Sequence, residues 1–202
     1  RTFHLGGTAS RAVEQSVHST RYDGVLKLKN IQSVVNRQGK LVVMNRNGDA
    51  FIIDESGRER EHFKLVYGAI LNFKDGDKVT KGATVAEWDP YTIPIITEKS
   101  GKVVFTDMLE GLSIRTVVDD TTGIASKVVI ESKQYSRGAD LRPRVQLLDK
   151  KGKSVELSSG LEAKHYLPVG AVLSVEDGSE VTAGDILARI PRESTKTRDI
   201  TG

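Results

Sequence analysis

The sequence contains no cysteine, which excludes disulfide bonds and thiolate metal ligands. Aromatic residues make up only 5% of the 202 residues, so any core must rely on valine, isoleucine and leucine. No apolar run approaches the roughly 18 residues of a membrane span, and no signal peptide is visible. These absences favour a protein of the reducing cytoplasm without a membrane partner.

The charge and composition also narrow the class of protein and of fold to which the chain can belong. The formal net charge of +3 is small for 202 residues, so it permits contact with nucleic acid but does not indicate a dedicated DNA-binding domain. Glycine is frequent, with 19 residues, and stretches of helical period are scarce. The chain is therefore expected to be mainly β structure with many turns and short or no helices.

Short apolar runs separated by turns begin at Arg21, and they occur twice. Residues 24–28 (GVLKL) match residues 101–105 (GKVVF) at an offset of 77 residues. The strongest match pairs residues 68–82 (GAILNFKDGDKVTKG) with residues 170–184 (GAVLSVEDGSEVTAG) at an offset of 102 residues. Because the offset only grows, the second copy has the same order of elements with longer loops.

The repeat predicts two similar β domains, at 21–97 and 98–192. An N-terminal arm and connector, 1–20, would precede them, and a linker, 193–202, would follow. Residues 95–105 could complete either domain, so the boundary between the copies stays open. The sole tryptophan, Trp88, is expected to cap the first core.

The repeated segment GAxLxxxDGxxVxxG has a local structural logic. Asp-Gly marks a tight turn because glycine accepts a positive φ at no steric cost. The segment resembles the sandwich-barrel hybrid fold of lipoyl and biotinyl domains. This resemblance implies two tandem sandwich-barrel hybrid (lipoyl/biotinyl-like) domains.

A carrier function is not supported by the residues. Lipoyl and biotinyl domains present a modifiable lysine on a hairpin after the second turn of the segment. The corresponding residues here are 87–93 (EWDPYTI) and 189–194 (RIPRES), and neither stretch contains lysine.

Other candidate sites have simpler structural explanations. Residues 72–77 (NFKDGD) faintly resemble a metal-binding polymerase motif, but a turn explains both copies, whereas a metal explains only one. His18, His62 and His165 are isolated from acidic partners at ligand spacing, so each is expected to be a surface or half-buried residue. No metal site is predicted. The C-terminal basic residues could touch nucleic acid, but a linker is the simpler interpretation; they are Arg189, Arg192, Lys196 and Arg198.

The first seven residues, RTFHLGG, carry the clearest chemistry. If they continue a helix, Arg1 and His4 project from one face, where a guanidinium and an imidazole suit a triphosphate. Gly6 and Gly7 then break the helix and supply a hinge. Without further context, a frayed terminus with a chance histidine explains the same residues.

The stretch RTFHLGG, followed by TASR, closely resembles the trigger loop of bacterial RNA polymerase β′ subunits, and residues 199–202 (DITG) resemble the re-entry into its second helix. The residues between them resemble the lineage-specific insertion at the tip of that loop. The resemblance implies that the chain is a fragment of a larger nucleotidyltransferase subunit, inactive when isolated. Arg1 would contact the triphosphate of the nucleotide, His4 would sit beside the β-phosphate as proton donor or electrostatic catalyst, and Phe3 would pack the folded loop.

The same resemblance implies the setting of the chain. Mg²⁺ would be held elsewhere in the subunit, with no cofactor in this fragment. The partners would be the rest of β′, the β, α and ω subunits, a sigma factor and a nucleoside triphosphate, with contact to downstream DNA left open. The location would be the cytoplasm, with the nucleoid. The insertion would modulate trigger-loop closure, elongation, pausing and transcript cleavage.

Two alternatives remain at this stage. A free-standing binding module of two lipoyl-like domains would make the N-terminal motif coincidental. A membrane-fusion adaptor built on lipoyl-like domains would need long helical hairpins, which the sequence lacks.

Overall fold

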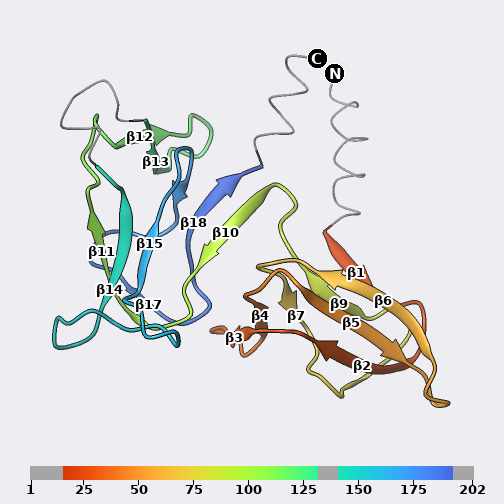
Figure 1. The fold of residues 1–202 in the computed structure, drawn as a ribbon. Coiled ribbons are helices and arrows are strands. Elements are labelled where there is room, and N and C mark those ends of the chain that lie inside the picture. The colour runs from red at the N-terminus through yellow and green to blue at the C-terminus, as the bar shows by residue number, and fades with distance from the viewer. Residues whose placement is uncertain (1–15, 132–140, 193–202) are drawn as a thin grey trace. The chain divides into compact units, whose positions relative to one another are not determined.

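The structure is a computed structural model that describes residues 16–131 and 141–192 (Figure 1). Within these ranges every regular element is a β-strand and all strand pairs are antiparallel, which confirms the expected mainly β class. The chain divides into two compact units, Arg1–Tyr91 and Thr92–Gly202.

The first unit contains two antiparallel sheets. Their orders are β1-β9-β7-β4-β3 and β6-β5-β2-β8. The strands are β1 (Val17–Ser19), β2 (Gly24–Lys29), β3 (Ser33–Val35), β4 (Leu41–Val43), β5 (Gly48–Ile53), β6 (Glu59–Leu65), β7 (Ile70–Leu71), β8 (Lys78–Val79) and β9 (Thr84–Glu87).

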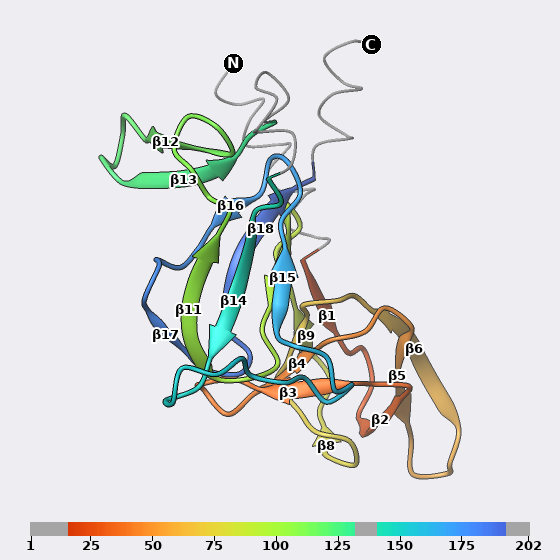
Figure 2. The same ribbon diagram turned by 60° about the vertical axis from the view of Figure 1, so that its left-hand side comes forward.

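The second unit repeats this topology strand for strand. Its sheets have the orders β10-β18-β16-β13-β12 and β15-β14-β11-β17, so each strand of the first unit has a counterpart nine places later (Figure 2). The strands are β10 (Thr92–Ile96), β11 (Gly101–Thr106), β12 (Ile114–Val118), β13 (Ala125–Val129), β14 (Arg144–Leu148), β15 (Lys164–Tyr166), β16 (Val172–Leu173), β17 (Glu180–Val181) and β18 (Ile186–Pro191).

The strand pairing shows where each copy begins. Strand β10 pairs with β18 from Thr92↔Pro191 to Ile96↔Ile186, so it belongs to the second unit. Its counterpart β1 pairs in the same way with β9, and the first copy therefore begins before Arg21. The sequence comparison placed the starts at residues 21 and 98 because β1 and β10 have dissimilar sequences.

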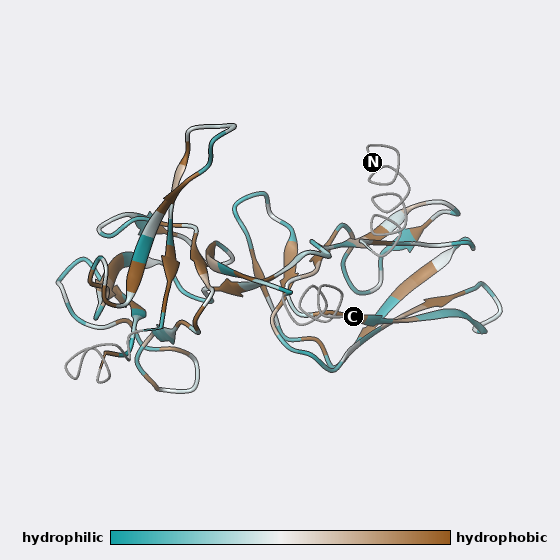
Figure 3. Ribbon diagram, turned by 90° about the horizontal axis from the view of Figure 1, so that it is seen from above, coloured by the Kyte–Doolittle hydropathy of each residue, from teal (hydrophilic) through white to brown (hydrophobic). Residues whose placement is uncertain are grey.

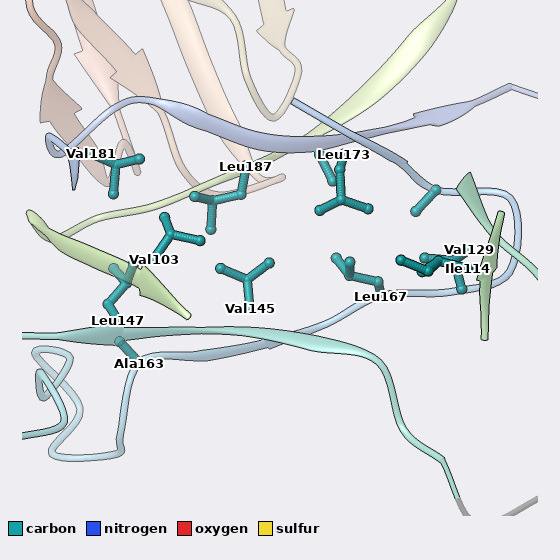
Figure 4. Close-up of a cluster of buried hydrophobic side chains, with 12 residues drawn as sticks. Val103, Ile114, Val129, Val145, Leu147, Ala163, Leu167, Leu173, Val181 and Leu187 are labelled. Atoms are coloured by element: carbon teal, nitrogen blue, oxygen red, sulfur yellow. The ribbon is translucent and has the colours of Figure 1, made fainter. Parts of the chain in front are cut away.

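Each unit has its own hydrophobic core of small and branched aliphatic residues. In the first unit Trp88 and Phe63 pack, partly buried, against a fully buried cluster that includes Leu26, Ile52 and Val85. Figure 3 shows that hydrophobic residues lie mainly in the strands and hydrophilic ones mainly in the connecting loops. The core of the second unit is shown in Figure 4; its labelled members are Val103, Ile114, Val129, Val145, Leu147, Ala163, Leu167, Leu173, Val181 and Leu187.

Candidate functional site

The residues singled out for chemistry, Arg1, His4, Gly6 and Gly7, lie outside the described residues. What the structure describes is the way in which the chain that follows them is attached to the first unit. The attachment begins at Ser16 and includes strand β1.

Strand β1 is fixed by backbone hydrogen bonds at both of its ends. The Trp88 N–H donates to the carbonyl oxygen of Ser16 over 3.0 Å. At the other end, the Thr20 N–H donates to the carbonyl oxygen of Ala83 over 2.9 Å, and the Gly82 N–H donates to the Thr20 carbonyl over 2.7 Å. The central residues of β1 pair with β9.

The His18 side chain adds an aromatic contact to this attachment. Its ring stacks on Phe63 with centroids 4.5 Å apart and planes 9° apart, and it lies 4.9 Å from the Trp88 ring. Burial lowers the pKa of His18, against the raising effects of a backbone hydrogen bond at Lys64 and the charge of Glu61. His18 is therefore half-buried, one of the two placements that the sequence predicted, and its ring packs against two aromatic side chains.

Thr20, which directly follows β1, adds buried side-chain contacts to this attachment. The contacts of His18 and Thr20 are together called the anchor below. Its side chain is almost fully buried, and its hydroxyl lies 2.6 Å from Glu61 Oε1 and 2.8 Å from the Tyr22 carbonyl oxygen. The same Glu61 oxygen accepts the Arg21 N–H over 2.7 Å. These contacts tie β1 to β6 of the second sheet, so the strand is held to both sheets of the first unit.

The aspartates of residues 72–77 stabilise a turn. Asp75 Oδ1 accepts the Leu28 N–H over 2.8 Å, and Asp77 Oδ2 accepts the Lys74 N–H over 2.8 Å. The second copy repeats the first of these bonds, from the Phe105 N–H to Asp177 Oδ1 over 2.9 Å. The turn interpretation is therefore confirmed. In the described ranges no group of three or more His, Cys, Asp or Glu residues could hold a metal ion.

The remaining two histidines have different surroundings. His62 Nε2 donates to Asp49 Oδ1 over 2.8 Å, and Lys64 Nζ lies 3.0 Å from the same oxygen. Hydrogen bonds from His62 and Lys64 lower the pKa of Asp49. His165 is largely buried, and its Nε2 atom has no hydrogen-bond partner. Burial lowers its pKa, and the charge of Glu98 opposes that shift.

One surface feature was not found from the sequence. On the sheet β6-β5-β2-β8, Lys27 and Lys29 alternate with the core residues Leu26 and Leu28, and Phe51 lies on the neighbouring strand. The period-2 alternation of lysine and leucine in residues 26–29 is the signal that could have located this face. No helix in the described part of the chain has the length and hydropathy of a membrane span.

Comparison with known proteins identifies the family. The sequence profile described as "RNA polymerase Rpb1, domain 5" matches residues 1–201. Proteins named "DNA-directed RNA polymerase subunit beta'" from Rickettsia bellii (strain RML369-C), Rickettsia typhi (strain ATCC VR-144 / Wilmington) and Rickettsia prowazekii (strain Madrid E) are each 59% identical to this chain over all 202 residues. The chain spans only 15% of the length of each of these relatives. The chain therefore belongs to the family described as RNA polymerase Rpb1, domain 5.

Proposed function

We propose that this chain is a segment of the β′ subunit of a DNA-directed RNA polymerase, which transfers nucleotidyl groups from nucleoside triphosphates to the 3′ end of RNA. The observation that carries the proposal is the 59% identity to β′ subunits along all 202 residues. The matched region extends over both ends of the chain, where the RTFHLGG and DITG motifs flank the two β units in the sequence.

In this proposal the terminal motifs are the two arms of a trigger loop. The loop folds over the incoming nucleotide, where Arg1 binds the triphosphate and His4 stands beside the β-phosphate. His4 acts there as proton donor or as electrostatic catalyst, Phe3 packs the folded loop, and Gly6 and Gly7 form the hinge. Closure excludes water and completes the site, so these residues act only in the closed state.

The two β units are the insertion carried by that loop. The proposed order is the arm and connector, the two domains, and the returning linker. Any contact that favours one state of the loop shifts the open–closed equilibrium by the difference in contact free energy between the states. The anchor at His18 and Thr20 supports this role, because it binds the chain that leaves the loop to both sheets of the first unit. The insertion thereby modulates elongation, pausing and transcript cleavage.

The proposed setting is the cytoplasm, with the nucleoid. The partners are the rest of β′ and the β, α, ω and sigma subunits. Mg²⁺, held elsewhere in the subunit, would supply positive charge to the triphosphate and to the attacking hydroxyl. The described residues offer no ligand set for it, so no step in this chain is assigned to the metal. Isolated from the subunit, the chain is expected to have no catalytic activity.

The test is made in the complete enzyme. Replacing residues 8–198 by a short linker should change pause lifetimes while nucleotide addition continues. His4→Ala in the unshortened subunit should slow addition at saturating nucleotide, because the lost contact forms on closure. Complete loss of addition after the linker replacement, in a correctly assembled enzyme, would contradict the modulatory role of the insertion. A native reading frame that ends near Gly202 would instead support a free-standing binding module.

A further inference from the structure

The sheet β6-β5-β2-β8 presents one side to the core and the other to solvent. Leu26 of β2 and Ala50 and Ile52 of β5 are fully buried, so their sequence neighbours point outward. Figure 1 shows β2, β5 and β6 side by side, as their pairing requires. The outward residues that matter here, called the outer face below, are Lys27, Lys29, Phe51, His62 and Lys64.

The outer face has an aromatic centre. Phe51 is directly opposite Lys27 on one neighbouring strand and His62 on the other. The rings of Phe51 and His62 stack with centroids 4.5 Å apart and planes 7° apart. The ammonium of Lys29 lies 5.1 Å from the centroid of the Phe51 ring. Beside these side chains the surface forms a hollow of about 410 Å³. Lys27, Lys29 and Phe51 line one part of it, and the acidic residues Asp54 and Glu59 line another.

The cations around this centre are unequally neutralised. Asp49 holds both His62 and Lys64. Among the described residues, by contrast, no carboxylate lies within salt-bridge distance of the ammonium of Lys27 or Lys29. Within residues 16–131 and 141–192, the contact recorded for the Lys29 ammonium is the one with the Phe51 ring, an interaction that is weak at an exposed site. Two cations of β2 are therefore available to an anionic ligand, both on the Phe51 side of the stacked aromatic pair.

We propose that the outer face binds single-stranded nucleic acid, with bases on the Phe51–His62 stack and phosphates on Lys27 and Lys29. Aromatic side chains on an open sheet, flanked by cations, are the means by which proteins bind unpaired strands. A base that covers the Phe51 ring displaces the Lys29 ammonium, which then binds a phosphate. The binding goes beyond the proposed trigger-loop role and depends only on the residues of this face.

The chemistry favours an unpaired strand over other anions. A duplex keeps its bases stacked on one another, so it offers phosphates but no base face to Phe51. An acidic polypeptide likewise satisfies only the lysines. RNA and DNA single strands share the base and the phosphate, and the experiment below separates them.

The second unit provides a built-in comparison. By strand position its β11 and β14 correspond to β2 and β5, and there Gln146 replaces Phe51 and Val104 replaces Lys27. Gln146 is hydrogen-bonded to Thr106, the counterpart of Lys29, over 2.8 Å. Lys102 of β11 is an exposed lysine on this face without the aromatic centre, which makes it a matched control.

The experiment is a fluorescence-anisotropy titration of the 202-residue chain with labelled oligo(U) and oligo(dT) of about 12 nucleotides, a length within the range of single-strand sites. A duplex of the same length and polyglutamate serve as competitors. We expect saturable binding of at least one single strand, and the logarithm of Kd should rise with the logarithm of salt with a slope of about 1.4 for two phosphates. Phe51→Ala should weaken binding about tenfold, whereas Phe51→Trp should retain it.

The variants separate the two parts of the site. Lys27→Gln combined with Lys29→Gln should remove most of the salt dependence, and Lys102→Gln should change nothing. Thermal unfolding of each variant verifies that the fold is retained. Binding of only RNA or only DNA supports the proposal and identifies the strand. Four results would each overturn it: no saturable binding of either strand, no effect of Phe51→Ala, equal loss with Lys102→Gln, or equal competition by polyglutamate. None of these results bears on the polymerase assignment, which is tested by pausing.

Discussion

Thr20 and Thr97 occupy equivalent places at the start of the two units and make the same local contacts. Each is almost fully buried, at 2% and 0% exposed. The Thr20 hydroxyl lies 2.8 Å from the Tyr22 carbonyl, and the Tyr22 N–H donates back to it over 3.1 Å. The Thr97 hydroxyl has the same pair of bonds with Lys99, at 2.7 and 3.1 Å. In each copy a threonine that follows the first strand thus hydrogen-bonds through its hydroxyl to the backbone two residues further along the chain.

The first prediction concerns these threonine hydrogen bonds. Thr97→Ala removes a buried acceptor and leaves the Lys99 N–H without its partner, so the free energy of unfolding of the second unit should fall by about 1–2 kcal/mol. Thr97→Ser keeps the hydroxyl and should lose less. Urea unfolding, followed by resonances of the second unit, measures both. Equal losses for the two variants would show that the methyl group, rather than the hydrogen bonds, is responsible.

A second prediction compares two glycines at equivalent positions, Gly24 and Gly101. A Cβ atom added at Gly24 would lie 2.5 Å from the Ile53 carbonyl oxygen, whereas one added at Gly101 would lie 3.0 Å from the Leu148 carbonyl oxygen. A backbone oxygen in a central strand cannot move away as a side chain can. Gly24→Ala should therefore destabilise its unit by about 3 kcal/mol and Gly101→Ala by about 1 kcal/mol.

The measurement for this pair is again chemical unfolding resolved by unit. Because both substitutions are to alanine, the unfolded chains gain the same restriction, and the difference reports the native contact. An inverted order, with Gly101→Ala the more damaging, would contradict the steric explanation.

The repeat and its turns could be predicted from sequence because they depend on local chemistry. Gly76 and Gly178 have φ values of 91° and 89°, a conformation that few residues other than glycine adopt, so Asp-Gly marks the turn in both copies. Strands β1 and β10 could not be recognised from the sequence, because their partner strands, β9 and β18, are distant in the chain. The similarity that we find between the two segments is a pair of threonines, Thr20 and Thr97, which make the same hydrogen bonds. The few residues of a short strand do not indicate its pairing register with a strand that is distant in the sequence.

The outer face was missed for a related reason. Lys27 and Phe51 belong to different strands, and only the pairing of β2 with β5 places them opposite one another. The proposed trigger-loop residues present the reverse case. Arg1 and His4 were singled out through a local motif, and their roles stay a prediction because they lie outside the described residues.

A third prediction follows from His165, whose pKa is lowered by burial. The unfolded chain binds a proton near the ordinary pKa of 6.5, while the folded chain does so only at lower pH. Between those two values the unfolded state binds more protons, so the free energy of unfolding falls as the pH drops below about 6.5. Above that range the histidine is neutral in both states and has no pH-dependent effect.

Replacing His165 tests this explanation directly. By strand position its counterpart in the first unit is Phe63, which lies opposite Ala50 as His165 lies opposite Val145. His165→Phe removes the unpartnered Nε2 and should flatten the loss of stability of the second unit between pH 6.5 and pH 5. Thermal unfolding over that pH range measures the effect. An unchanged pH profile would assign the dependence to another group.

The last prediction connects the anchor of β1 with the proposed polymerase function. His18→Ala removes the ring stacked on Phe63, a contact with a contribution of about 0.5–1.5 kcal/mol, without touching the buried cluster. Hydrogen exchange at the amide of Thr20 should accelerate. In the complete enzyme the pause lifetimes should move toward those of the linker replacement, because a frayed β1 couples the insertion less firmly to the loop.

The control is Val35→Ala, an exposed position on β3 at the far edge of the same sheet. Faster exchange at Thr20 with unchanged pausing would mean that β1 does not carry the coupling.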